Sequence, residues 1–240
     1  YNDWHIDEWA GSYPDRFIPL SMPAIWDPKV MAEEVRRVAK KGCRAVSFTE
    51  NPDKLRLPSI HAAHWEPFWQ ACVDEGMTIL IHIGSGGGMV FPTMDSPVEV
   101  MISTTPISIV NLAADLLFST LLRKYPTLKF ALSEGGIGWV PYFLERADYT
   151  YAHHHAWTHQ DFGNKLPSEV FREHIFNCFI DDKAGIRMRD LIGIDTIMWE
   201  CDYPHSDTTW PNSPEAVWDA VSVLTDAQIE SLAFEAGVQG

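Results

Sequence analysis

The chain has 240 residues, enough to bury the core of one large α/β domain. Its 18 basic residues are outnumbered by 33 acidic residues, and the resulting net charge of −15 repels a phosphate backbone, which argues against nucleic-acid binding. Four cysteines stand singly in apolar segments, and no apolar run reaches the roughly 20 residues that span a bilayer, so we expect a soluble, cytoplasmic protein with reduced thiols and no membrane partner.

Strand-like and helix-like segments alternate along the whole chain. The opening residues show no strand pattern and predict an amphipathic helix followed by a loop. Apolar runs then predict six strands, at 16–23, 43–51, 77–88, 128–136, 174–182 and 195–204. Amphipathic patterns predict helices after these strands, at 27–42, 64–76, 107–126, 139–157, 183–193 and 213–224.

This alternation predicts a parallel sheet covered by helices, the α/β class. No linker or change of composition divides the six units, so we expect one domain over residues 1–240. A doubly wound dinucleotide-binding sheet is an alternative, but the glycine run at 84–88 lacks the G-x-G-x-x-G spacing. Because a (β/α)8 TIM-like barrel needs eight strands, the sequence predicts either an open sheet or a barrel whose first two strands lie outside this chain.

Ionisable side chains recur where the predicted strands end. Glu50 and His82 end the second and third strands, Glu134 follows the fourth, and Asp202 and His205 follow the last. In a β/α barrel these positions meet at the C-terminal rim, where reactive residues gather. Imidazole and carboxylate ligands suit a catalytic divalent cation, so His82 and Asp202 are the candidate metal ligands. The alternatives are a hydrogen-bonded core histidine and a loop-capping aspartate.

Three segments together resemble the amidohydrolase superfamily: "ILIHIGSGG" at 79–87, "FALSEGGIGWVPYFLERAD" at 130–148 and "MWECDYPHSDTTWP" at 198–211. The most similar branch contains aminocarboxymuconate semialdehyde decarboxylase and the resorcylate-type decarboxylases. The resemblance implies a distorted (β/α)8 barrel with one divalent metal ion, commonly Zn²⁺ or Mn²⁺. It makes the strand at 16–23 the third of the barrel, and it places His82 on the fifth strand and Asp202 on the eighth.

The chain departs from this family in two respects. The family takes further metal ligands from a His-x-His or Glu-x-His pair on the first strand, and no segment here replaces that pair. The histidines at 153–155 have His-x-His spacing but lie in an aromatic helical pattern that predicts a surface. Many members also have a histidine after the sixth strand, where this chain has Glu134. That carboxylate either accepts a proton in catalysis or caps the Gly-Gly turn.

Four further residues are candidates for substrate binding. Glu50 ends a strand at the same rim and either holds substrate or supports a ligand. His61 and His64 belong to the loop before the second helix, where His64 is equally suited to cap that helix. Trp139 offers an apolar wall, with core packing as the alternative.

The sequence therefore predicts a metal-dependent enzyme that hydrolyses or non-oxidatively decarboxylates a small carboxylated or aromatic substrate. Asp202, Glu134 and His205 are its expected catalytic residues. We expect Zn²⁺ first and Mn²⁺ second as the cofactor, and a homodimer as the assembly. The rival hypothesis is a non-catalytic barrel fragment with a structural role.

Overall fold

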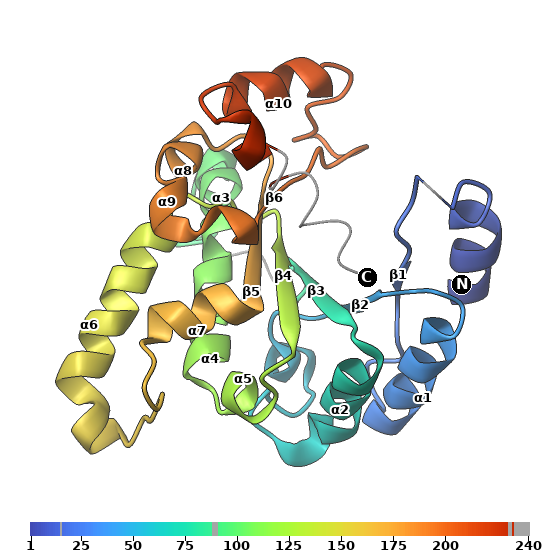
Figure 1. The fold of residues 1–240 in the computed structure, drawn as a ribbon, viewed down its shortest axis with the longest axis horizontal. Helices are drawn as coiled ribbons and strands as arrows, with labels where there is room; N and C mark the ends of the chain where they lie inside the picture. Colours follow the sequence, from blue (N-terminus) through green and yellow to red (C-terminus); the bar gives the residue numbers. More distant parts are fainter. Residues whose placement is uncertain (15, 88–90, 230–231, 233–240) are drawn as a thin grey trace. The chain divides into compact units, whose positions relative to one another are not determined.

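The computed structural model describes residues 1–14, 16–87, 91–229 and 232 (Figure 1). Six parallel strands belong to one sheet and follow one another across it in chain order, which confirms the predicted α/β class. The chain divides into two compact units. Of the described residues, those within 1–88 and 119–131 form unit 1, and those within 89–118 and 132–239 form unit 2.

Unit 1 contains the first three strands and the helices that follow the first two. Its β1–β2 and β2–β3 pairs are parallel, with Leu20 opposite Ala45 and Val46 opposite Ile79. The elements are η1 (Trp4–Ala10), β1 (Leu20–Ser21), α1 (Pro28–Ala39), β2 (Ala45–Phe48), η2 (Pro52–Leu55), η3 (Ala63–Trp65), α2 (Glu66–Glu75), β3 (Thr78–His82) and α5 (Leu121–Lys124). Strand β4 (Lys129–Ser133) begins in unit 1 and ends in unit 2.

The helix boundaries in unit 1 follow from local chemistry. Asp27 caps α1, since its Oδ1 accepts hydrogen bonds from the backbone N–H groups of Lys29 at 2.9 Å and Val30 at 3.3 Å. Gly76 ends α2 with a φ of 63°, a left-handed conformation that glycine adopts without steric cost. Both boundaries are where the sequence predicts them.

One face of strands β2 and β3 packs against α2. Side chains that point to the opposite face are not covered by this helix. The ring of Phe48 lies 5.1 Å from Trp65 and 5.0 Å from Trp69, measured between ring centroids. Along β3, Ile79 and Ile81 are buried while His82 is exposed. Because side chains alternate along a strand, His82 lies on the face of the sheet that α2 leaves open.

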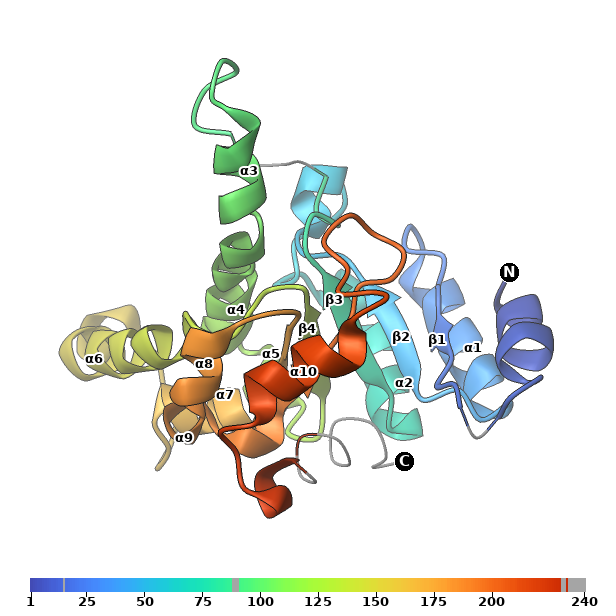
Figure 2. The same cartoon turned by 90° about the horizontal axis from the view of Figure 1, so that it is seen from above.

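Unit 2 contains the last two strands with their surrounding helices (Figure 2). Strands β5 and β6 are parallel, with Asn177 opposite Ile197 and Phe179 opposite Trp199. The elements are α3 (Val98–Thr104), η4 (Pro106–Ser108), α4 (Ile109–Phe118), α6 (Val140–Thr158), α7 (Pro167–His174), β5 (Ile175–Phe179), α8 (Lys183–Arg187), α9 (Arg189–Ile192), η5 (Ile194–Thr196), β6 (Ile197–Trp199) and α10 (Ser213–Val221).

The structure corrects two predicted helices and adds two. The helix predicted at 107–126 is interrupted, because the buried Ser119 hydroxyl accepts a hydrogen bond from the Leu121 N–H at 3.2 Å and forms a local turn instead. The helix predicted at 183–193 breaks at Met188 into α8 and α9. Helices α3 and α7 were not predicted. The histidines at 153–155 lie on α6, where His153 and His155 are on or near the surface, as predicted.

No single helix in the described ranges has the length and apolar composition needed to cross a bilayer. The bent pair Val98–Thr104 and Pro106–Phe118, which meet at 47°, passes that test by length and composition alone.

The four cysteines are free thiols, in agreement with the sequence prediction. Cys43, Cys72 and Cys178 are buried, whereas Cys201 is partly exposed. Burial raises the pKa of the Cys72 thiol, and burial followed by the charge of Glu200 raises that of Cys178. Since only the thiolate is nucleophilic, both thiols are unreactive near neutral pH.

These differences predict the order of thiol modification. In native protein at pH 8, an aromatic disulfide reagent is expected to modify Cys201 first, and Cys201→Ser is expected to remove that fast phase. All four thiols react once the protein is unfolded. A fast phase that persists in the Cys201→Ser variant would show that one of the three buried thiols is accessible.

Candidate active site

His82 is held by its own loop in an orientation that suits a metal ligand. Its Nδ1 lies 2.6 Å from the carbonyl oxygen of Ile83. A carbonyl oxygen only accepts hydrogen bonds, so Nδ1 carries a proton, and in the neutral form of the ring the lone pair is on Nε2. Histidines that bind metals commonly donate their second N–H to a carbonyl in this way, which fixes the tautomer.

The loop after His82 is tied to the end of β2 through Ser85. The Ser85 hydroxyl donates to the carbonyl oxygen of His82 at 2.7 Å and accepts from the Glu50 N–H at 3.0 Å. Thr49 donates through its hydroxyl to the Ser85 carbonyl oxygen at 2.7 Å. The Glu50 carboxylate accepts from the Gly86 N–H at 3.3 Å. Glu50 is therefore hydrogen-bonded to the His82 loop, and its role toward substrate or a metal ligand stays a prediction.

The two other candidates in unit 1 lie in the loop that follows β2. Both His61 and His64 are exposed. The His64 ring packs edge-on against Trp65 at 4.8 Å, and the Trp65 indole N–H is shared between the carbonyl oxygens of Pro58 at 2.8 Å and Ser59 at 3.0 Å. His64 belongs to the short helix η3, and no N-cap hydrogen bond involves its side chain. Contact of either histidine with substrate stays a prediction.

In unit 2, Glu134 follows β4 in a strained conformation that a second carboxylate stabilises. Its φ is 62°, in the left-handed region that non-glycine residues rarely adopt. Its backbone N–H donates to Oε1 of Glu200 at 2.6 Å, a short bond typical of a charged acceptor. Ser133 and Glu200 also contact the buried thiol of Cys178. Such strain concentrates at functional sites, which supports a role for this turn.

The glycine turn after Glu134 is held by Asp182 and Trp139. The Asp182 carboxylate accepts from the N–H groups of Ile137 at 2.8 Å, Gly138 at 2.6 Å and Gly185 at 2.8 Å. Asp182 thereby caps α8 and also ties it to the turn. The Trp139 indole N–H is shared between the carbonyl oxygens of Gly135 and Gly136, both at 3.0 Å. Trp139 thus fixes the turn through its polar edge.

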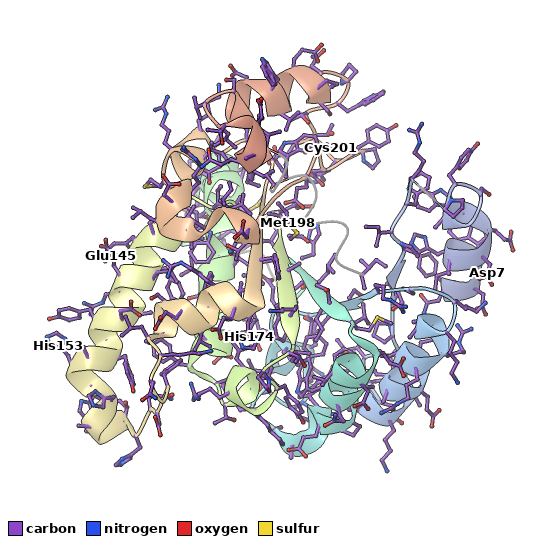
Figure 3. All side chains as sticks on the ribbon, in the orientation of Figure 1. Asp7, Glu145, His153, His174, Met198 and Cys201 are labelled. Atoms are coloured by element: carbon purple, nitrogen blue, oxygen red, sulfur yellow. The ribbon has the colours of Figure 1, made fainter. Side chains whose placement is uncertain are left out.

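Asp202 follows β6 and has the second strained backbone of the site, with a φ of 53°. Its side chain is only 12% exposed, and Oδ2 is buried without a well-aligned hydrogen bond. His205 Nδ1 approaches that oxygen to 2.8 Å, a close ion-pair distance that lacks hydrogen-bond alignment. The His205 N–H donates to the Asp202 carbonyl oxygen at 2.8 Å and closes the turn. Met198 and Cys201, labelled in Figure 3, come from β6 and the segment that leads to Asp202.

Imidazole and carboxylate are ligand types that divalent cations take in proteins. Burial of a carboxylate is costly unless it is paired or coordinates a metal; within the described residues, Asp202 Oδ2 has no aligned hydrogen bond and is approached by His205 Nδ1 at 2.8 Å. His82 offers Nε2 as a second ligand. His82 belongs to unit 1 and Asp202 to unit 2, so their convergence on one cation stays a prediction. Across the described part of the chain, no group of three or more His, Cys, Asp or Glu side chains is arranged to hold a metal ion.

A sequence model described as Amidohydrolase matches residues 1–233. The chain belongs to the amidohydrolase family. The resemblance inferred from the three motifs is therefore confirmed. No curated protein matches the sequence.

Solved structures share the fold of this amidohydrolase at low sequence identity. A 5-carboxyvanillate decarboxylase from Sphingomonas paucimobilis has a TM-score of 0.74 and 20% identity over 96% of this chain and 70% of its own. An amidohydrolase from Mycobacterium avium subsp. paratuberculosis has a TM-score of 0.74 and 20% identity over 96% of this chain and 59% of its own. The chain therefore spans less than two thirds of that protein.

A third neighbour was solved with ligands. It is a 5-carboxyvanillate decarboxylase from Novosphingobium aromaticivorans that contains manganese and 3-methoxy-4-hydroxy-5-nitrobenzoic acid. Its TM-score is 0.77 at 18% identity, over 99% of this chain and 68% of its own. At identities of 18% and 20%, these likenesses show a shared fold.

The residues that hold the loops of this amidohydrolase together were not predicted from its sequence. Ser85 and Glu200 were given no role, although both stand at strand ends. Their contacts join segments 35 and 66 residues apart, and local patterns carry no signal for such pairs. Asp182 had a signal, its position before α8, but that position predicts one hydrogen bond to the helix and not the two to the glycine turn.

Proposed function

We propose that this amidohydrolase is a metal-dependent carboxy-lyase that removes CO₂ from a small aromatic carboxylate. The observation that carries the proposal is the buried Asp202 Oδ2, which has no aligned hydrogen bond although its side chain is almost fully enclosed. The tautomer of His82, fixed by the Ile83 carbonyl oxygen, supports it. The names of two neighbours, which are decarboxylases of 5-carboxyvanillate, give the substrate class.

We further propose that the six strands are the third to eighth strands of a (β/α)8 barrel. In that arrangement His82 ends the fifth strand and Asp202 follows the eighth, both at the C-terminal rim. The cation is Zn²⁺ or Mn²⁺, and the manganese in the Novosphingobium neighbour favours the second. A divalent cation bound there polarises substrate oxygens and offsets the charge of the protein near an anionic substrate.

The residues of this chain have separable roles in the proposal. His82 and Asp202 bind the cation. His205 holds the Asp202 carboxylate from the solvent side, at 2.8 Å. Glu134, held by Glu200, is the acid that protonates the ring carbon as CO₂ departs. In the hydrolytic alternative, Asp202 instead takes a proton from water as that water attacks the substrate.

Three parts of the proposal come from sequence alone. They are a single domain over residues 1–240, a homodimeric assembly and a cytoplasmic location. Glu50, His61, His64 and Trp139 keep their proposed place around the substrate, with Glu50 and Trp139 acting through the loops they fix.

A turnover screen tests the function. Purified protein supplied with Zn²⁺ or Mn²⁺ is expected to release CO₂ from one or more ortho-hydroxylated benzoates, and His82→Ala is expected to abolish the release. Lactones serve as the comparison, because their opening without CO₂ release would identify the hydrolase instead. Failure with both substrate classes and both metals in well-folded protein would favour the non-catalytic barrel.

A further inference from the structure

The N-terminal segment of unit 1 forms a pocket that the proposed function does not use. The pocket has a volume of about 420 Å³, within the usual range for small-ligand sites. It is lined by Trp4, Glu8, Trp9, Ser12, Tyr13 and Phe17. Four aromatic rings and one carboxylate in a single pocket is an uncommon combination that needs a physical explanation.

The helix η1 produces this arrangement. It is a π-helix, a rare form that is frequent at functional sites. Ile6 and Ala10 are buried on its inner side. Trp4, Trp9 and Tyr13 follow at intervals of five and four residues, close to the π-helical repeat, and are 49%, 46% and 64% exposed. Trp4 and Trp9 of the helix, and Tyr13 in the turn that follows it, are therefore displayed at the surface instead of being buried.

The rings of the pocket are tilted against one another. The centroids of Trp9 and Phe17 are 4.4 Å apart at an interplanar angle of 43°, and those of Tyr13 and Phe17 are 6.3 Å apart at 67°. The His5 ring stacks on the Trp9 ring, with the two ring centroids 5.2 Å apart. Tilted rings of this kind line the sides of the pocket. The face of each ring is the negative side of its quadrupole and attracts cations.

Two of the three carboxylates at η1 and its N-cap are paired with cations. Asp3 pairs with Arg37 at 2.6 Å and Lys41 at 3.1 Å, and Asp7, labelled in Figure 3, pairs with Lys41. These cations lower the pKa of Asp3 and fasten η1 to α1. Within the described ranges, no ion pair joins Glu8 to a lysine or arginine. Glu8 is thus the carboxylate that remains for a ligand.

We propose that this pocket binds an organic cation, an alkylated or quaternary ammonium group. Trp4, Trp9, Tyr13 and Phe17 supply the ring faces, and Glu8 supplies the counter-charge. A neutral apolar guest gains the ring contacts but leaves the Glu8 carboxylate partly dehydrated and unpaired, which costs free energy. The net charge of −15 favours the approach of a cation. The site requires no metal ion and is independent of the proposed decarboxylation.

A matched pair of guests tests the site. Choline and 3,3-dimethyl-1-butanol have the same shape and differ in charge. Proton NMR of the folded protein is expected to show saturation transfer to the choline methyl groups and an upfield shift caused by the aromatic rings. Choline is expected to bind at least about tenfold more tightly than the alcohol, and excess EDTA is expected to leave its affinity unchanged.

Variants locate the binding. Glu8→Gln and Trp9→Leu are each expected to weaken choline binding by about fivefold or more. Trp26→Leu is the matched control, because Trp26 is 73% exposed and lies outside the pocket. Circular dichroism establishes that each variant is folded. Equal binding of the two guests, absence of choline binding by wild type, or unchanged affinity in both pocket variants would overturn the proposal.

Discussion

Asp182→Ala is expected to lower the free energy of unfolding by about 3 kcal/mol or more. The substitution leaves the N–H groups of Ile137, Gly138 and Gly185 without the carboxylate that now accepts from all three. Hydrogen bonds to a charged acceptor each contribute about 1.5–3 kcal/mol, and their effects at one residue are not additive. Urea denaturation followed by circular dichroism measures the loss.

The neighbouring residue provides the control for this prediction. Asp181 has the same charge and is exposed, and no described hydrogen bond involves its carboxylate. Asp181→Ala is expected to change the free energy of unfolding by less than about 0.5 kcal/mol. If the two variants are equally stable, the carboxylate of Asp182 does not hold the glycine turn, and the described position of Glu134 loses its support.

His82→Ala and Asp202→Asn are each expected to weaken binding of Mn²⁺ or Zn²⁺ by more than about 100-fold, since loss of a supporting partner alone costs 10–100-fold. Alanine removes the Nε2 lone pair, and asparagine removes the charge of the buried carboxylate while keeping its shape. Decarboxylation is expected to be lost together with the metal. Metal content after gel filtration and isothermal titration with Mn²⁺ measure the effect without relying on turnover.

His153→Ala is the matched control for the metal prediction. That histidine lies on α6, donates through Nδ1 to the Tyr149 carbonyl oxygen at 2.8 Å, and stacks on the Tyr149 ring at 3.8 Å. Its replacement is expected to leave metal affinity unchanged. If the His82→Ala variant keeps full affinity for Mn²⁺ and Zn²⁺, His82 is not a metal ligand.

Strand periodicity and helix caps were sufficient to predict most of the fold. Six strands, the cap at Asp27 and the stop at Gly76 all follow from patterns within ten or so residues. The interruption at Ser119 was not predictable, because an apolar helical pattern continues through it and only the buried hydroxyl turns the chain. Helix α7 was missed because its pattern is short and directly precedes a strand.

The candidate site, like the fold, was only partly predictable from the sequence. His82 and Asp202 were found because they stand where strands end, and alternation along β3 places His82 on the open face. The strained backbones of Glu134 and Asp202 carry no sequence signal, since both residue types usually adopt ordinary conformations. They persist because Glu200, Asp182 and a short turn at His205 hold them, and these contacts exist only after the strands have assembled.

The central claim is that one divalent cation is bound by the side chains of His82 and Asp202. Anomalous diffraction at the manganese edge, from crystals grown with Mn²⁺, tests it most directly. We expect one strong peak within about 2.0–2.3 Å of both His82 Nε2 and an Asp202 carboxylate oxygen. A peak that contacts neither side chain, or two side chains that approach different sites, would contradict it.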